Sequence, residues 1–208
     1  MDLQLHNQHV LITGGSKGIG LACAQAFLAE GARVSLVSRD QANLERARHT
    51  LQAQFAAERI HTVAADLRDA QAALAALDSA EAAFGPVDVL VNSAGAAKRT
   101  PAPELTPEAW QDSMQAKYFT YIHMMNPAIQ RMAARGAGNV VNVVGNGGKV
   151  ASPIHLPGGA ANAALMLASV GLAAAYGPQG IRVNAVNPGL TRTDRLQEGL
   201  VADARNQG

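Results

Sequence analysis

Residues 10–20 read Val-Leu-Ile-Thr-Gly-Gly-Ser-Lys-Gly-Ile-Gly, and this stretch decides the fold. Its apolar, β-branched start is typical of a buried strand, and the alanine-rich residues after Gly20 are typical of a helix. Between them, glycines at positions 14, 18 and 20 allow a tight turn and a close approach of the backbone. The N–H groups and the dipole of a helix N-terminus attract anions. The stretch therefore predicts a strand, a phosphate-binding turn and a helix.

Similar β-branched runs alternate with alanine- and leucine-rich runs along the whole chain, which is typical of a parallel sheet covered by helices on both faces. The expected strands are His9–Thr13, Arg33–Val37, His61–Ala64, Val87–Asn92, Asn139–Val144 and Arg182–Val186. The expected helices lie near Gly18–Glu30, Gln41–Ala57, Ala70–Phe84, Pro107–Ala134 and Gly159–Tyr176. Thr106 before Pro107 is typical of a helix start, and Gly31 is typical of a helix end.

Length and composition restrict the class of protein. With 208 residues, of which 48% are hydrophobic, we expect one compact α/β domain over residues 1–208. The 17 basic and 16 acidic residues nearly cancel, so no nucleic-acid partner is expected. Cys23 is the single cysteine, so no intrachain disulfide can form, and we expect no metal site. No signal-like start and no run near 18 apolar residues is visible, so we expect a cytoplasmic protein without a membrane segment.

The glycine spacing Gly-x-x-x-Gly-x-Gly, with Thr13 before it, resembles the classical short-chain dehydrogenase/reductase family, in particular its 3-oxoacyl-carrier-protein-reductase-like members. Three further motifs extend the resemblance. They are Asp66-Leu67 after the third expected strand, Asn-Ser-Ala-Gly at residues 92–95, and Arg-Val-Asn-Ala-Val-Asn-Pro-Gly at residues 182–189 with Thr193 beyond.

This resemblance implies a Rossmann-like, doubly wound parallel sheet of strand order 3-2-1-4-5-6, with the family's seventh strand absent from this chain. It implies a dinucleotide-binding domain for a nicotinamide cofactor, in which Asp66 accepts from the adenine amine. The implied cofactor residues are Gly14, Ser16, Lys17, Gly18, Ile19, Gly20, Ser38, Arg39, Asp66, Leu67, Asn92, Ala94, Gly95, Pro188, Gly189, Thr191 and Thr193.

The end of the second expected strand bears on the choice of cofactor. A carboxylate there would hold the ribose 2′-hydroxyl, whereas an arginine favours a 2′-phosphate. Ser38 ends the strand, Arg39 follows, and Lys17 lies in the glycine turn, which together suit a phosphate. We therefore expect NADP(H) rather than NAD(H), and the alternative is that Asp40 reaches the ribose.

In the resembling family, a tyrosine protonates the carbonyl oxygen, a lysine four residues later lowers the pKa of that tyrosine, and a serine and an asparagine assist. Here the asparagine, serine, tyrosine and lysine positions hold Lys117, Gly145, Gly158 and Asn162. No tyrosine occurs between positions 121 and 176, so a shift of alignment does not supply one. We therefore expect the usual carbonyl chemistry to be impaired.

Two residues are candidate substitutes for the lost catalytic groups. His155 precedes the lost tyrosine by three positions and suits proton transfer near neutral pH, and the alternative is a loop histidine without a role. Lys117 would attract an acidic substrate or a phosphate if it faces the cleft, and would be an ordinary surface lysine if it faces solvent.

Three functions remain open on the sequence. The first is an oxidoreductase for a small carbonyl or alcohol that uses other proton donors. The second is an inactive family member that serves as a ligand sensor or partner subunit, and the third is non-redox chemistry with His155. The helix from Ala160 carries no charged residue, so we expect it to be buried, and the family's twofold pairing of such helices implies a homodimer.

Overall fold

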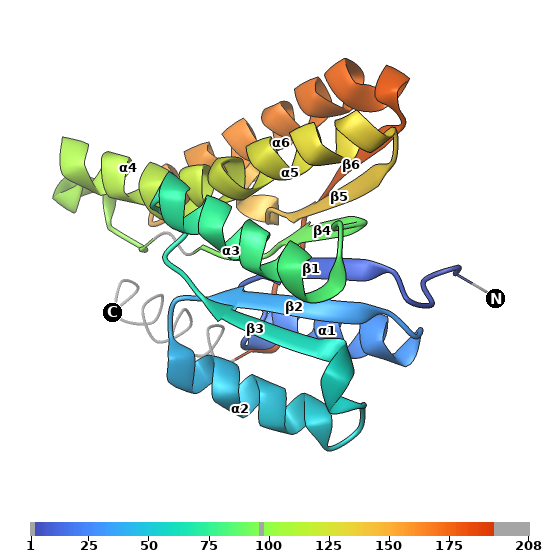
Figure 1. Ribbon diagram of the computed structural model, residues 1–208. Coiled ribbons are helices and arrows are strands. Elements are labelled where there is room, and N and C mark those ends of the chain that lie inside the picture. The colour runs from blue at the N-terminus through green and yellow to red at the C-terminus, as the bar shows by residue number, and fades with distance from the viewer. Residues whose placement is uncertain (1–2, 96–97, 194–208) are drawn as a thin grey trace.

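A computed structural model describes residues 3–95 and 98–193 (Figure 1). Within these residues, parallel strands form one sheet in the order β3-β2-β1-β4-β5-β6, which confirms the predicted doubly wound arrangement. The strands are β1 (His9–Thr13), β2 (Arg33–Ser38), β3 (Ile60–Ala64), β4 (Val89–Asn92), β5 (Gly138–Val143) and β6 (Ile181–Val186). The predicted absence of a seventh strand concerns the end of the chain, and residues 194–208 lie outside the described part.

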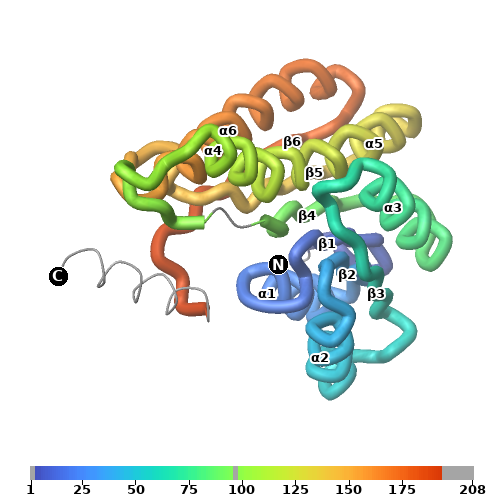
Figure 2. The backbone as a smooth tube through the Cα atoms, turned by 90° about the vertical axis from the view of Figure 1, so that its left-hand side faces the viewer, coloured from blue at the N-terminus to red at the C-terminus, as the bar shows by residue number. Residues whose placement is uncertain are grey.

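Helices cover both faces of the sheet, as Figures 1 and 2 show. One face carries α1 (Gly18–Ala29) and α2 (Gln41–Gln52), and the other carries α3 (Ala70–Phe84), α5 (Thr120–Arg135) and α6 (Leu156–Tyr176). Short 3-10 turns are η1 (Ala57–Arg59), η2 (Ala102–Glu104), η4 (Asn146–Gly148) and η5 (Gly177–Gln179). Because both faces are covered, the central strands β1 and β4 are buried at every position.

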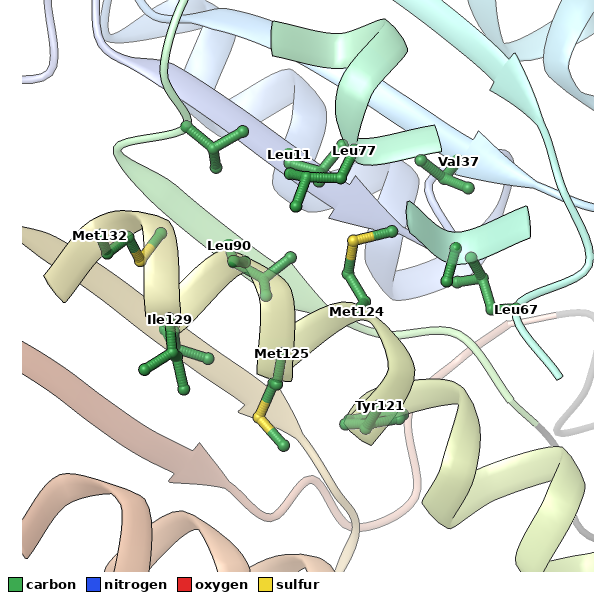
Figure 3. Packing of buried hydrophobic residues seen from close by; sticks show 14 of the residues in the cluster. Leu11, Val37, Leu67, Leu77, Leu90, Tyr121, Met124, Met125, Ile129 and Met132 are labelled. Atoms are coloured by element: carbon green, nitrogen blue, oxygen red, sulfur yellow. The ribbon is translucent and has the colours of Figure 1, made fainter. Parts of the chain in front are cut away.

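The larger part of the core lies between the sheet and the helices α3 and α5. Figure 3 shows Met124 of α5 extending toward Leu77 of α3, and Leu90 of β4 and Met125 of α5 belong to the same cluster. All four side chains are fully buried. Each large apolar side chain buried in this way contributes about 1.5–3 kcal/mol to folding, so this layer fixes α5 against the sheet.

A buried histidine joins two strands to the end of α3. His9 has no exposed surface, its Nε2 lies 2.9 Å from Ser35 Oγ, and its Nδ1 lies 2.8 Å from the Gly85 carbonyl oxygen. Its ring packs edge-on against Phe84 at 5.5 Å between centroids. Burial lowers the pKa of His9 below its usual value, which favours the neutral ring in the folded protein.

The prediction of one continuous α-helix over Pro107–Ala134 is wrong. Instead, α4 (Pro107–Ser113) is joined to α5 by a π-helical segment, η3 (Met114–Phe119), which contains Lys117. The start is as predicted, since the Thr106 hydroxyl accepts a hydrogen bond from the Ala109 N–H at 3.3 Å. A π-helical turn widens the helix locally, often at functional sites, and leaves little trace in hydrophobic periodicity.

Helix α6 differs from expectation in two respects. It begins at Leu156 rather than near Gly159, and it is not buried all round, because Leu167 is 75% exposed and Val170 is 67% exposed. The stretch Leu156–Gln179 is also long and apolar enough to cross a membrane by length and composition alone, contrary to the expectation of no such run. In the fold, its buried residues pack toward the sheet as part of the core.

Candidate functional site

The turn between β1 and α1 requires glycine at two closely packed positions. Gly14 has a φ of +66°, in the left-handed region that favours glycine. A Cβ on Gly14 would lie 2.8 Å from the Ala94 nitrogen, and a Cβ on Gly20 would lie 2.3 Å from the Gly14 carbonyl oxygen. Both separations are too short for a real Cβ. The tight turn thus brings the N-terminus of α1 to the carboxyl end of the sheet.

The N-terminus of α1 fits a dinucleotide pyrophosphate. Lys17 is its N-cap residue and makes no side-chain capping hydrogen bond, so no side chain of that residue covers the first amides. Beside them, Ser16 Oγ donates to Ser38 Oγ at 3.0 Å. The methyl group of Thr193 lies 3.4 Å from the position that a Cβ on Gly18 would take. The structure therefore brings these predicted cofactor residues together, with Ile19 on the first turn of the helix.

The residues after β2 divide into an exposed cation and a capping carboxylate. Arg39 is exposed, immediately beyond the strand. Asp40 is the N-cap of α2, and its Oδ1 accepts a hydrogen bond from the Asn43 N–H at 2.8 Å. The carboxylate that was the alternative ligand of the ribose is thus already engaged by the helix.

Asp66, after β3, is held by an arginine two residues later. Arg68 Nη2 donates to Asp66 Oδ2 at 2.5 Å. The Arg68 hydrogen bond is the main reason that the pKa of the Asp66 carboxyl lies below its usual value, and the charge of Arg39 lowers it further. Arg39 and Asp66 both follow the carboxyl ends of neighbouring strands, β2 and β3. Leu67 is buried, and its carbonyl accepts from the ring of His123 at 2.9 Å.

Buried polar side chains of β1, β4 and β5 support the turn after β4. Thr13 Oγ1 donates to Asn92 Oδ1 at 3.2 Å and accepts from the Ala94 N–H at 3.2 Å. Asn92 Nδ2 donates in turn to Asn142 Oδ1 of β5 at 3.1 Å. Asn92 has no exposed surface. The buried hydrogen bonds of Thr13 and Asn92 therefore hold the turn that contains Ala94 and Gly95.

A cavity of about 370 Å³ lies beyond the carboxyl ends of β4, β5 and β6. Loops after these strands line it, together with η3 and the first turns of α6. The cavity is lined by all four residues predicted at the family's catalytic positions, Lys117, Gly145, Gly158 and Asn162, and by His155. This is the edge at which doubly wound sheets bind their ligands. Pro188 and Gly189 line its far side, and Thr191 lies two residues beyond Gly189.

Lys117 is buried at the cavity wall, so the alternative of a solvated helix face is wrong. Lys117 is only 8% exposed. The Nζ atom donates to Tyr121 Oη at 2.8 Å and to the Val143 carbonyl oxygen at 3.2 Å. Tyr121 Oη donates to the same carbonyl at 2.6 Å. These contacts fix the lysine between η3 and the end of β5.

The loop after β5 has a backbone that suits glycine. Gly145 has a φ of +124°, which side-chain-bearing residues rarely adopt. A Cβ there would lie 3.3 Å from Asn162 Nδ2. Asn162 is only 6% exposed, and among the described residues its Oδ1 has no hydrogen-bond partner. A side chain at position 145 would therefore be strained by the backbone.

The sequence analysis missed two polar residues of the cavity, Arg99 and Ser152. Arg99 is half-buried in the loop after β4, and the next residue, Thr100, donates its N–H to the Ile154 carbonyl oxygen at 3.0 Å. That bond joins two loops distant in sequence, so no local pattern signals it. Within the described ranges, no cluster of three or more His, Cys, Asp or Glu could hold a metal ion.

Comparison with known proteins agrees with this geometry. A family profile described as short chain dehydrogenase matches residues 8–202. D-threitol dehydrogenase of Mycolicibacterium smegmatis is 34% identical over 195 residues, covering 93% of this chain and 74% of that protein. Human L-xylulose reductase is 37% identical over 198 residues, covering 95% and 77%.

Among solved structures, a variant of actinorhodin polyketide ketoreductase with NADPH superposes with a TM-score of 0.89 at 28% identity, covering 94% of this chain and 75% of that one. The finer resemblance to 3-oxoacyl-carrier-protein reductases stays a prediction. The profile match, the relatives and the glycine turn all agree, and the chain therefore belongs to the short-chain dehydrogenase family of oxidoreductases, whose members bind a nicotinamide dinucleotide.

Proposed function

We propose that the protein is an NADP(H)-dependent oxidoreductase that interconverts a small polar alcohol and its carbonyl compound. The observation that carries the proposal is the position of the cavity at the same sheet edge as the glycine turn. The relatives named D-threitol dehydrogenase and L-xylulose reductase support a small polyhydroxylated substrate. Steady-state oxidation of NADPH with a panel of ketoses, and reduction of NADP⁺ with polyols, tests the activity. The proposal fails if no compound is turned over.

The preference for NADP(H) is supported by the groups near the end of β2. Arg39 is exposed and Ser38 is hydrogen-bonded to the glycine turn, while the nearest carboxylate, Asp40, caps α2. Arg39→Gln is expected to weaken NADPH binding about 5- to 30-fold, because one charge-assisted contact to a phosphate is lost at an exposed position. NADH binding should be unchanged. Fluorescence titration measures both, and an equal effect on the two cofactors would refute the preference.

His155 is the proposed acid and base in place of the missing tyrosine. It lines the cavity and is half-buried at the N-cap of α6. When bound, the cofactor would accept a hydride from the substrate carbon. His155 would take the hydroxyl proton in that direction and return it in the reverse one, so that alcohol and oxidised cofactor give carbonyl, reduced cofactor and a proton.

His155→Ala should lower kcat by about 10²- to 10⁴-fold, the usual contribution of a general acid, and leave the Kd for NADPH unchanged. His49→Ala is the matched control, because His49 is exposed on α2. Turnover that persists in His155→Ala would exclude this role.

We also propose that two copies of the chain pair through α6. The exposed apolar side chains of Leu167 and Val170 support this assembly, since exposed apolar surface commonly marks an interface.

A further inference from the structure

The cavity lining is unusual in its charge. Arg99 and Lys117 are its basic residues, His155 adds an imidazole, and none of its described lining residues is Asp or Glu. We propose that this cavity binds the anionic group of a small hydroxy acid, with Lys117 and Arg99 holding the oxyanion. The inference rests on the proposed function, because it assigns the substrate class of the same site.

Lys117 is placed for this role by the π-helical segment. The residue is only 8% exposed, and its Nζ is held by Tyr121 Oη at 2.8 Å and by the Val143 carbonyl oxygen at 3.2 Å. The Nζ also lies 4.5 Å from the centre of the Tyr121 ring. Burying a basic group costs free energy. The two acceptor oxygens and the Tyr121 ring around Lys117 Nζ offset this cost and hold the amine in one position at the cavity wall.

Arg99 approaches the cavity from another part of the chain. The hydrogen bond from Thr100 N–H to the Ile154 carbonyl oxygen joins its loop to the segment that leads into α6. Arg99 and His155, which flank this bond, both line the cavity. A guanidinium group and an amine that approach one space from two elements suit an oxyanion, which accepts several hydrogen bonds at once.

The N-terminus of α6 adds to the positive potential that Lys117 and Arg99 give the cavity. Its N-cap residue His155 makes no side-chain capping hydrogen bond, and Gly158 in its first turn lines the cavity. The positive end of the helix dipole therefore faces the same space and favours an anion there. Glycine at 158 also leaves room that a larger side chain would fill.

A second, independent observation indicates that the ligand also carries a hydroxyl group. Asn162 lines the cavity and is 94% buried, and its Oδ1 has no hydrogen-bond partner among the described residues. A buried acceptor without a donor costs free energy, which a ligand hydroxyl would recover by donating to it. The cavity thus offers basic groups for an oxyanion and an amide for a hydroxyl, the two features of a hydroxy acid.

The test measures binding to the NADPH-saturated protein by isothermal titration calorimetry. The probes are four-carbon compounds of the same configuration: threonate and threitol 4-phosphate, in which an anionic group replaces one terminal hydroxyl group, and neutral threitol. Threonate is expected to bind more tightly than threitol, with an affinity that falls as salt rises. Tighter binding of the phosphate ester than of threonate would keep the oxyanion site and assign it to phosphate. Equal binding of the anions and of threitol, or binding of threitol alone, would overturn the proposal, as would binding of no anion.

Lys117→Met and Arg99→Gln should each weaken anion binding about 10- to 150-fold, the range for loss of one charge-assisted hydrogen bond. Lys149→Met is the control, because Lys149 is an exposed lysine of the neighbouring loop and makes the same charge change. Thermal unfolding and NADPH titration of each variant confirm that it is folded. Anion binding that is unchanged in folded Lys117→Met would refute the assignment.

These outcomes separate the two proposals. Anion binding without turnover of any alcohol or carbonyl keeps the site and rejects the oxidoreductase. Turnover of neutral polyols without preference for anions keeps the oxidoreductase and rejects the anion site.

Discussion

Gly20→Ala tests whether the close packing of the glycine turn creates the cofactor site. The added Cβ would lie 2.3 Å from the Gly14 carbonyl oxygen, whereas ordinary contacts begin near 3.4 Å. The start of α1 must therefore move by about 1 Å relative to the turn, because both partners are backbone and no flexible side chain can yield.

The cost follows from this displacement. Overpacking of this kind destabilises by about 1–3 kcal/mol, and alanine returns up to about 1 kcal/mol of helix propensity. With the full 1 kcal/mol returned, the net loss is about 0–2 kcal/mol, which for a chain of this size lowers Tm by at most about 8 °C. A 1 Å shift also lengthens the hydrogen bonds from the first amides of α1 to phosphate. NADPH affinity should therefore fall at least about tenfold.

Circular dichroism melting of the protein without cofactor and fluorescence titration with NADPH measure the two effects. Gly171→Ala is the matched control, because a Cβ at Gly171 in α6 meets no heavy atom within 4 Å. That variant should gain about 0.5–1 kcal/mol and bind NADPH normally. If Gly20→Ala melts and binds NADPH as the unaltered protein does, the packing argument for the site is refuted.

Three other predictions concern stability and assembly. Burial lowers the pKa of His9 in the folded protein, so the unfolded chain binds a proton first as pH falls below 6.5. The free energy of unfolding should therefore decline from pH 7 to 5, and it should decline less steeply in His9→Asn than in His49→Asn, the control at an exposed site. Equal slopes in the two variants would contradict this origin. Asn142→Leu should destabilise by about 2–4 kcal/mol in urea unfolding, because it strands buried polar groups of β4 and α6, and a loss below about 1 kcal/mol would show that the network contributes little. Leu167→Glu combined with Val170→Glu should convert a dimer to a monomer in sedimentation velocity, and an unchanged sedimentation coefficient would exclude α6 as the interface.

The sequence predicted the sheet well because its signals are local. Strands buried on both faces read as apolar runs, and the glycines at 14, 18 and 20 follow such a run directly. The cap at Thr106 and the left-handed Gly31 were also predicted correctly, since each depends on neighbouring residues alone.

Local sequence patterns do not encode the features of the structure that the sequence failed to predict. The π-helical segment keeps the composition of a helix, so hydrophobic spacing did not separate it from α4 and α5. Arg99 reaches the cavity through a hydrogen bond between two loops more than 50 residues apart. The exposure of Leu167 likewise could not be read from an apolar helix, because apolarity does not say whether another helix of the same chain or a second copy covers it.

The predicted substitutions at the family's catalytic positions concern binding and chemistry separately. The resemblance predicts that Asn162 of α6 takes the position of the family's lysine, and the lysine that lines the cavity is Lys117 of η3. The proton donor has no such replacement at Gly158, and the φ of +124° at Gly145 means that a serine restored there would be strained. On the proposals made above, Lys117 and Arg99 supply the attraction for an anion, and His155 supplies the acid. The two proposals therefore assign recognition of the substrate's charge to Lys117 and Arg99 and proton transfer to His155, and the variants described above test these roles separately.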